Sequence, residues 1–300
     1  MGTLFRGSAT YPGGEHRPVA TIGNFDGLHL GHQRLVSRLL EQARELDAPS
    51  LVYTFDPPPR IVLQPRKAPP RIATLEQKVQ GLFDLGVDHV VVEEFTLEFG
   101  AQPPEWFADE IIGRLQPRAM VVGYDFRYGQ GRAGNAETLR AHRPGLPVEA
   151  VEALQQGPVT VGSSRIREAV AEGRVQDAAV MLGRPYALVG AVVEGDRRGR
   201  TMGFPTANID ADNELIPAPG VYAVRVDGRG GVANLGVRPT FDGARFVIEV
   251  HLFDFDGDLY GQRLQIDFVQ RIRPEQRFKS TAELVEQIRK DAALARAALD

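Results

Sequence analysis

The hydrophobic pattern changes its period once along the chain, near Pro185, and this change constrains the fold more than any other feature of the sequence. Before it, short apolar runs alternate with segments of helical period. The predicted strands are residues 19–22, 51–55, 89–92 and 119–122, and the predicted helices are residues 32–46, 75–85 and 104–115. Strands separated by crossover-length helices are typical of a parallel sheet covered on both faces. We therefore predict a Rossmann-like α/β domain, whose ligands bind beyond the carboxyl ends of the strands.

After Pro185 the chain contains short segments rich in β-branched residues, separated by turns of Gly, Asp and Pro. The predicted strands are residues 186–193, 221–226, 231–235, 246–253 and 264–269. No long helical period intervenes before Ser280, which precedes Glu283 by three residues in the pattern of a capping box. We predict an antiparallel barrel or sandwich that ends in a C-terminal helix. The predicted domains are residues 1–183 and 184–300.

Composition excludes several classes of protein. A chain of 300 residues, 43% hydrophobic and 25% charged, can bury two ordinary cores. Its net charge of -4 is shared about equally by the two halves, which does not favour a non-specific nucleic-acid binder. Cysteine is absent, which excludes disulfides and thiolate metal sites. No apolar run has the length of a membrane span or the character of a signal peptide, so we expect a soluble, cytoplasmic protein.

The string TIGNFDGLHLGHQRLV is the most specific motif of the first half. A predicted strand ends, a glycine-containing loop follows, and His29 and His32 open a predicted helix. Backbone N–H groups in such a loop, together with a helix N-terminus, favour a phosphate. The two histidines can donate hydrogen bonds to charge that develops on a phosphoryl group. Gly31 between them allows a triphosphate to approach the backbone closely.

A second polar segment, VGSSRIR at residues 161–167, precedes another helical run. Its hydroxyls, its helix-starting N–H groups and its two arginines suit a triphosphate. On its own this segment would be interpreted as a serine-capped surface helix.

The first half resembles the nucleotidyltransferase superfamily, whose HxGH motif supports attack on the α-phosphate of a nucleoside triphosphate. Class I aminoacyl-tRNA synthetases share a similar motif, but a KMSKS-like lysine segment is absent here. The finer resemblance is to the adenylyltransferase module of bacterial FAD synthetases, through residues 23–32, 123–129 and 161–167. It implies that ATP is bound by Gly23, Phe25, His29, Gly31, His32, Ser163, Ser164 and Arg167. It also implies that the junction between FMN and ATP is lined by Asn24, Asp125 and Phe126.

Some positions depart from that family pattern. Tyr128 stands where the family usually has Phe, and Gly162 and Ser164 stand where it has Ser and Thr. Pro58 falls where the family often has His, so a contact made by that histidine is missing.

The second half carries a Gly/Arg-rich loop that ends in the sequence PTAN, residues 205–208. Thr206 and Asn208 are two residues apart, so on an extended segment their side chains point the same way. Two neutral oxygens side by side can share an Mg²⁺ ion that ATP phosphates already hold. A Gly/Arg-rich loop alone is weak evidence, because it is also typical of a hairpin turn before a strand.

The order of the later motifs strengthens this interpretation. GRTMGFPTAN, PGVY, NLGVRPT, EVHLFD and DLYG follow one another as in the riboflavin kinase family, which the second half resembles. The resemblance implies that Thr206 and Asn208 bind MgATP and that Glu249 is the general base for the ribityl 5′-hydroxyl. It assigns further ATP contacts to Gly195, Arg200, Gly203 and Pro205.

Taken together, the chain resembles bacterial bifunctional FAD synthetases. The resemblance implies that riboflavin and ATP give FMN, and that FMN and ATP then give FAD and pyrophosphate, with Mg²⁺ bound to ATP. One alternative is a single-activity enzyme whose other half senses flavin, and another is a flavin- or RNA-binding module without turnover. A pantetheine-phosphate or nicotinamide-mononucleotide adenylyltransferase would leave the C-terminal half unexplained. The presence of both motif sets favours the bifunctional enzyme, with no nucleic-acid or membrane partner and with its oligomeric state left open.

Overall fold

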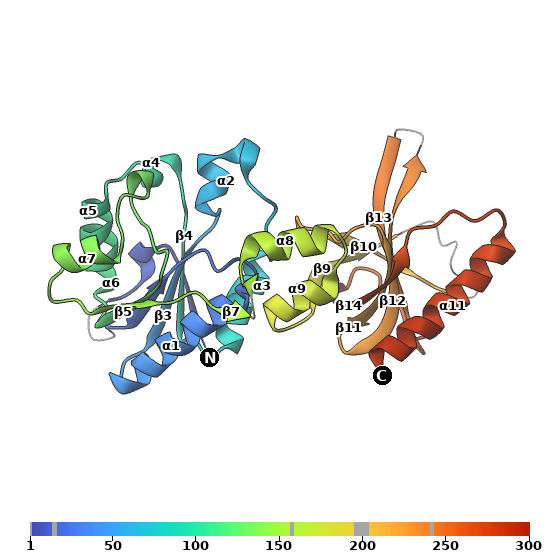
Figure 1. The fold of residues 1–300 in the computed structure, drawn as a ribbon, viewed down its shortest axis with the longest axis horizontal. Coiled ribbons are helices and arrows are strands. Elements are labelled where there is room, and N and C mark those ends of the chain that lie inside the picture. Colours follow the sequence, from blue (N-terminus) through green and yellow to red (C-terminus); the bar gives the residue numbers. More distant parts are fainter. Residues whose placement is uncertain (1, 14–16, 157–158, 195–203, 241–242) are drawn as a thin grey trace. The chain divides into compact units, whose positions relative to one another are not determined.

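Figure 1 shows the fold in a computed structural model that describes residues 2–13, 17–156, 159–194, 204–240 and 243–300. The chain forms two compact units, Met1–Pro69 with Leu75–Gly162, and Pro70–Thr74 with Ser163–Asp300. Each unit has its own sheet and core.

The first unit contains a six-stranded sheet in the order β1-β4-β3-β2-β5-β6, and all its pairings are parallel. The strands are β1 (Thr3–Arg6), β2 (Val19–Ile22), β3 (Ser50–Phe55), β4 (His89–Glu93), β5 (Ala119–Gly123) and β6 (Val148–Val151). The parallel α/β prediction is therefore confirmed. Sequence reasoning missed the two edge strands, β1 and β6.

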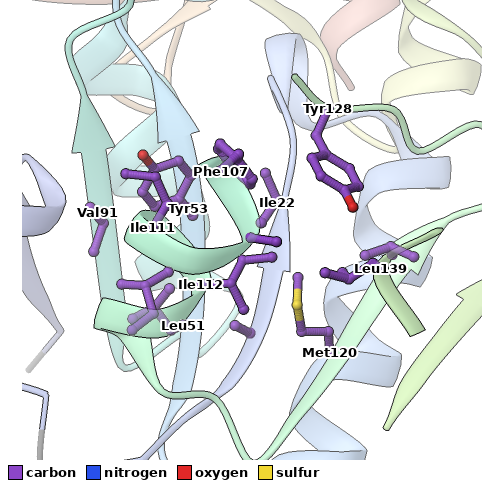
Figure 2. Close-up of a cluster of buried hydrophobic side chains, with 14 of the residues drawn as sticks. Ile22, Leu51, Tyr53, Val91, Phe107, Ile111, Ile112, Met120, Tyr128 and Leu139 are labelled. Carbon is purple, nitrogen blue, oxygen red and sulfur yellow. The ribbon is translucent and has the colours of Figure 1, made fainter. Parts of the chain in front are cut away.

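Apolar side chains cover both faces of this sheet. On one face, strand residues such as Ile22, Tyr53 and Met120 pack against Phe107 and Ile112, as Figure 2 shows. On the other face, alternate strand residues pack against two helices, α1 (Leu30–Glu45) and α3 (Leu75–Asp84). Buried apolar residues on both faces explain why the predicted strands are continuous apolar runs.

The segment predicted as a helix at residues 104–115 is helical, but its middle is a π-helix and not an α-helix. It consists of α5 (Pro104–Trp106), η4 (Phe107–Ile112), which is π-helical, and α6 (Gly113–Leu115). Shorter elements complete the unit: η1 (Ser8–Thr10), η2 (Asp26–Leu28), α2 (Pro59–Leu63), η3 (Pro65–Lys67), α4 (Leu97–Gly100), η5 (Gln130–Arg132), α7 (Ala136–His142), β7 (Gln155–Gln156) and β8 (Val159–Thr160).

The second unit contains a closed antiparallel barrel in the order β10-β13-β12-β11-β14-β9. Its strands are β9 (Tyr186–Val193), β10 (Ala207–Ala211), β11 (Gly220–Val226), β12 (Arg229–Thr240), β13 (Gly243–Leu252) and β14 (Arg263–Pro274). Closure selects the barrel over the sandwich alternative. The aromatic rings of Tyr186, Tyr222 and Phe268 pack together in its core, and each is at most 1% exposed.

Two helices that precede the barrel belong to the same unit, α8 (Ser163–Ala171) and α9 (Val175–Leu182). Arg271 of the barrel donates a hydrogen bond to the carbonyl of Glu172 over 3.1 Å, and the Ala218 N–H donates to the carbonyl of Val170. The compact units thus divide after Gly162, whereas the predicted domain boundary, 183/184, lies between α9 and β9.

The C-terminal helix, α11 (Thr281–Leu299), packs through Ala295 on Val221, Ala223 and Val232 of the barrel (Figure 1). Ser280 caps it by accepting a hydrogen bond from the Glu283 N–H over 3.2 Å. The Glu283 carboxylate accepts from the Lys279 N–H over 3.1 Å, one residue earlier than a capping box predicts. None of the helices within the described ranges is long and apolar enough to cross a membrane.

One largely buried ion pair ties this helix to the barrel. Arg273 of β14 donates to both carboxylate oxygens of Asp291, at 2.7 to 3.0 Å, and Gln287 donates to the same carboxylate. The Asp291 side chain is only 4% exposed.

We expect Asp291→Asn to destabilise the second unit by about 3 kcal/mol, because removing one partner of a buried pair leaves the other charge uncompensated. Trp106 is the chain's one tryptophan and lies in the first unit, so the two units can be followed separately. Urea unfolding of the mutant should show an earlier far-UV circular dichroism transition and an unchanged tryptophan fluorescence transition. Asp254→Asn breaks the exposed pair with Arg296 and should change the unfolding transition little, because solvent screens that pair. Equal effects of the two mutations would contradict this account.

Candidate functional sites

The strand order of the first unit fixes where a ligand can bind. β3 lies beside β2 on one side, with β4 beyond it, and β5 lies beside β2 on the other side. Loops that leave β2 and β5 at their carboxyl ends therefore diverge and leave a crevice, the usual ligand position in open parallel sheets. The HxGH loop follows β2, and the segment with Asp125 follows β5, so the topology places these two predicted site segments at the same point of the sheet.

The loop after β2 is anchored by its apolar side chains. Phe25 and Leu28 have left-handed backbone angles, with φ of 50° and 45°. Their side chains are 1% and 2% exposed in the core between the sheet and α1 and α3. Any contact that Phe25 makes with ATP must therefore come from its backbone. Asn24, by contrast, is exposed.

His29 and His32 are brought together by the first turn of α1. Their rings stack at 3.7 Å between centroids with 14° between planes. His29 is the N-cap residue, and its Nδ1 accepts the backbone N–H of His32 over 3.3 Å. Nδ1 therefore carries no proton, and a neutral His29 holds its proton on Nε2 as a donor. A Cβ on Gly31 would lie 3.2 Å from the His29 ring, so glycine leaves room for that ring.

His32 is held in its neutral form. Burial first, and then the electrostatic influence of His29 and of Lys78, holds the pKa of His32 well below its ordinary value. Its Nδ1 is buried and has no hydrogen-bond partner within the part of the chain that the structure describes. An unsatisfied buried ring nitrogen is unusual in proteins and points to a bound ligand or water.

The predicted flavin-side residues separate into exposed and buried groups. Asp125 is exposed just beyond β5, next to Tyr124, which is 61% exposed. Phe126 is 7% exposed, and its ring stacks on Tyr128 at 5.5 Å. Phe126 thus contributes to the core, and only its backbone can face a substrate.

The other predicted ATP residues lie in the second unit. Ser163 is the first residue of α8, and Ser164 beside it is exposed. Arg167, one turn later, donates from Nε to the carbonyl of Pro70 over 2.7 Å. The start of α8 is thus fastened to the segment Pro70–Thr74 of the same unit.

The barrel aligns two predicted kinase residues with a third polar side chain, across three strands. Asn208 of β10 is paired directly with Glu249 of β13, which on its other side is paired with Asn234 of β12. Flanking residues such as Ile248 and Val250 point into the barrel, so these three polar side chains share the outer surface. Directly paired residues have Cβ atoms about 5 Å apart. Glu249 is therefore flanked by two amide side chains.

His251 positions the PTAN segment. It lies two residues after Glu249 on the same face of β13, and its Nδ1 donates to the carbonyl of Pro205 over 2.8 Å. Its ring also contacts Phe204, with centroids 5.5 Å apart. This contact fixes the backbone directly before Thr206. The predicted residues Gly195, Arg200 and Gly203 lie outside the described residues.

Comparisons with known proteins match both halves of the chain. A family model for FAD synthetase matches residues 13–165, and one for riboflavin kinase matches residues 182–299. A bifunctional riboflavin kinase/FMN adenylyltransferase of Escherichia coli K12 is 41% identical over 93% of this chain and 91% of its own. The Bacillus subtilis enzyme of the same name is 39% identical, over 92% and 90%. The chain belongs to the bifunctional riboflavin kinase/FMN adenylyltransferase family.

A solved structure shows the same fold over the whole chain. It is described as a macrolide-efflux protein from Streptococcus pneumoniae, is 31% identical, and covers 98% of both chains with a TM-score of 0.88. The likeness to this structure extends over both units of the chain.

The sequence did not indicate three side chains that the structure places at or beside the candidate sites: Asn234, His251 and Lys78. The first two stand inside quoted motifs, NLGVRPT and EVHLFD, but their roles depend on strand register, which the motifs do not state. Lys78 had a signal of its own, since it lies three residues after Leu75 and four before Leu82, on the apolar stripe of a predicted helix.

The oxygen-rich kinase site fits a magnesium ion. Among the described residues, no group of three or more His, Cys, Asp or Glu side chains could hold a metal by itself. Thr206, Asn208 and Glu249 instead present a hydroxyl, an amide and a carboxylate. This oxygen donor set suits Mg²⁺ that arrives with ATP, because Mg²⁺ usually keeps waters and takes few protein ligands.

Proposed function

We propose that this chain phosphorylates riboflavin to FMN with its barrel unit, and that it adenylates FMN to FAD with the HxGH loop of its α/β unit. The observation that carries the proposal is that the HxGH loop and the kinase motifs belong to different compact units, and that each half is matched by its own family model. Riboflavin, FMN, FAD and ATP are then the small molecules that the chain binds.

In the kinase reaction the barrel supplies a base and an orienting frame. The ribityl 5′-oxygen of riboflavin attacks the γ-phosphorus of ATP, the bond to the β–γ bridging oxygen breaks, and ADP leaves. Glu249 accepts the proton of the attacking hydroxyl. Asn208 and Asn234 flank the carboxylate and orient it, and His251 holds the segment on which Thr206 contacts the nucleotide.

In the adenylyl transfer a phosphate oxygen of FMN attacks the α-phosphorus of ATP. The bond to the α–β bridging oxygen breaks, and pyrophosphate leaves. His29 donates from Nε2 to an α-phosphate oxygen as negative charge grows there, with His32 stacked beside it as the second predicted donor. The start of α1 adds its positive dipole end. The family motif supports further ATP contacts by Ser163, Ser164 and Arg167.

Mg²⁺ bound to ATP would neutralise phosphate charge, with Thr206 and Asn208 as the protein oxygens next to it. We also place the protein in the cytoplasm. The absence of cysteine agrees with a reducing compartment.

The proposal also assigns the activities to residues 184–300 for the kinase and 1–183 for the adenylyltransferase. We expect residues 163–300 to convert riboflavin to FMN and to form no FAD, because HxGH is missing. A fragment that begins at residue 184 should do the same but unfold at a lower temperature. The reason is that α8 and α9 bury Ile166, Val170 and Leu182, each at most 2% exposed, within this unit. Chromatography of the flavins and a thermal melt measure both effects. FAD formation by either fragment would contradict the assignment.

A further inference from the structure

Lys78 is a buried lysine on a helix that otherwise packs with apolar residues. It lies on α3, where Leu75, Val79 and Leu82 face the sheet, and it is 5% exposed. The other three lysines of the chain, Lys67, Lys279 and Lys290, are exposed. Because burying a charge is costly, a buried lysine must be satisfied by hydrogen bonds. Its hydrogen-bond partners therefore show which segments of the fold it connects.

The Lys78 ammonium donates to three acceptors at the carboxyl ends of two strands. Nζ lies 3.4 Å from the carbonyl oxygen of Asn24, 3.1 Å from Oγ1 of Thr54 and 3.1 Å from the carbonyl oxygen of Phe55. The Thr54 hydroxyl in turn donates to the same Asn24 carbonyl over 3.3 Å. An ammonium has three N–H donors, so it can serve these acceptors together. The contacts join the loop after β2 to the end of β3.

The loop so held is strained. The carbonyl group of Asn24 is bonded to the nitrogen of Phe25, whose backbone is left-handed. This conformation costs about 1–3 kcal/mol and persists only where the surrounding structure imposes it. One turn further along α3, a Cβ on Gly81 would lie 2.7 Å from the side chain of Leu28, the other left-handed residue. The same face of α3 thus contacts the loop near both strained positions. His29 follows Leu28 immediately.

We propose that Lys78 is a positioning residue for adenylyl transfer, which fastens the HxGH loop to the end of β3 and so fixes where His29 and His32 stand. This inference rests on the proposed adenylyltransferase function of that loop. Lysine suits the place better than arginine, because three short contacts converge on one compact nitrogen.

The first test is Lys78→Met, which keeps the length of the side chain and removes its charge and donors. We expect kcat for FAD formation from FMN to fall on the order of 10²-fold, because a displacement of about 1 Å at a reacting group costs that much. FMN formation from riboflavin on the same chain should be unchanged. Lys67→Met, at an exposed lysine of the same unit, should leave both rates unchanged.

A second variant keeps the proposal testable if Lys78→Met does not fold. Thr54→Val removes one acceptor and the Thr54–Asn24 bond but keeps the lysine. It should lower the same kcat by about tenfold, the kinetic equivalent of about one hydrogen bond. Trp106 fluorescence reports whether the first unit remains folded at the assay temperature. A folded Lys78→Met or Thr54→Val protein with wild-type kcat would overturn the proposal.

The ring titration of His32, followed by NMR, tests without turnover whether Lys78 acts on the HxGH histidines. The titratable groups that act on the pKa of His32 are His29, from its own loop, and Lys78, from α3. Removing the lysine charge relieves repulsion of the protonated ring, so the pKa of His32 should rise in Lys78→Met and stay unchanged in Lys67→Met. A lower melting temperature with an unchanged titration and unchanged kcat would show a structural role only. The titration needs no turnover, so it tests Lys78 even if wild-type protein makes no FAD, a result that would instead refute the proposed function.

Discussion

Glu249→Gln should lower riboflavin phosphorylation by roughly 10²–10⁴-fold, the usual contribution of a positioned general base. Glutamine keeps the size and reach of the side chain between Asn208 and Asn234, but it cannot accept the proton of the 5′-hydroxyl. Binding of riboflavin and MgATP should change little, because the nucleotide contacts are assigned to Thr206 and Asn208. The loss should therefore appear in kcat.

The same chain provides the control for this substitution. Adenylation of added FMN should continue at the wild-type rate, because its proposed histidines lie in the other unit. Glu286→Gln, at an exposed position of α11, should leave both reactions unchanged. Normal phosphorylation by Glu249→Gln with intact substrate binding would show that Glu249 is an outward-facing strand carboxylate and no base.

His29→Ala and His32→Ala should each lower FAD formation on the order of 10²-fold or more, as expected when a preorganised donor to the transition state is removed. FMN formation should be nearly unchanged in both. Initial rates with FMN and ATP, and separately with riboflavin and ATP, measure the two effects. Wild-type adenylation in the double mutant would contradict the proposed role.

His29 needs an additional variant, because its ring also caps α1. Loss of an N-cap costs about 1 kcal/mol, so His29→Ala combines a catalytic and a stability effect. His29→Asn retains a capping oxygen while removing the imidazole, and it should be as inactive as His29→Ala but more stable. His142→Ala, at a histidine paired with Asp109 in the same unit, should keep full adenylation.

The strands that are buried on both faces could be predicted from sequence almost to the residue. The apolar run at 19–22 is β2, and the runs at 51–55, 89–92 and 119–122 each differ from their strands by one residue at one end. In contrast, β1 is mostly exposed, and β10 carries the polar residues Asn208 and Asp210, so neither has an apolar run to detect. Their places depend on pairing partners distant in sequence.

The candidate sites could be predicted only as lists of motif residues. The motifs named Glu249 and Asn208, but their direct pairing depends on the register of β10 against β13. They also named Phe25 and Phe126, whose side chains prove to be core residues because the loops turn them inward. Lys78 was detectable as a charge on an apolar helix face, yet its partners are three backbone and side-chain groups that only the folded sheet brings together.

The most direct test of the account is a time course of the full chain with riboflavin, ATP and Mg²⁺, in which the three flavins are separated by chromatography. We expect riboflavin to decline, FMN to rise and then fall, and FAD to accumulate, with one ADP released per FMN formed and one pyrophosphate per FAD formed. Omitting riboflavin and supplying FMN should still give FAD. Riboflavin that stays unconverted, or FMN that accumulates without any FAD, would contradict the claim that one chain carries both activities.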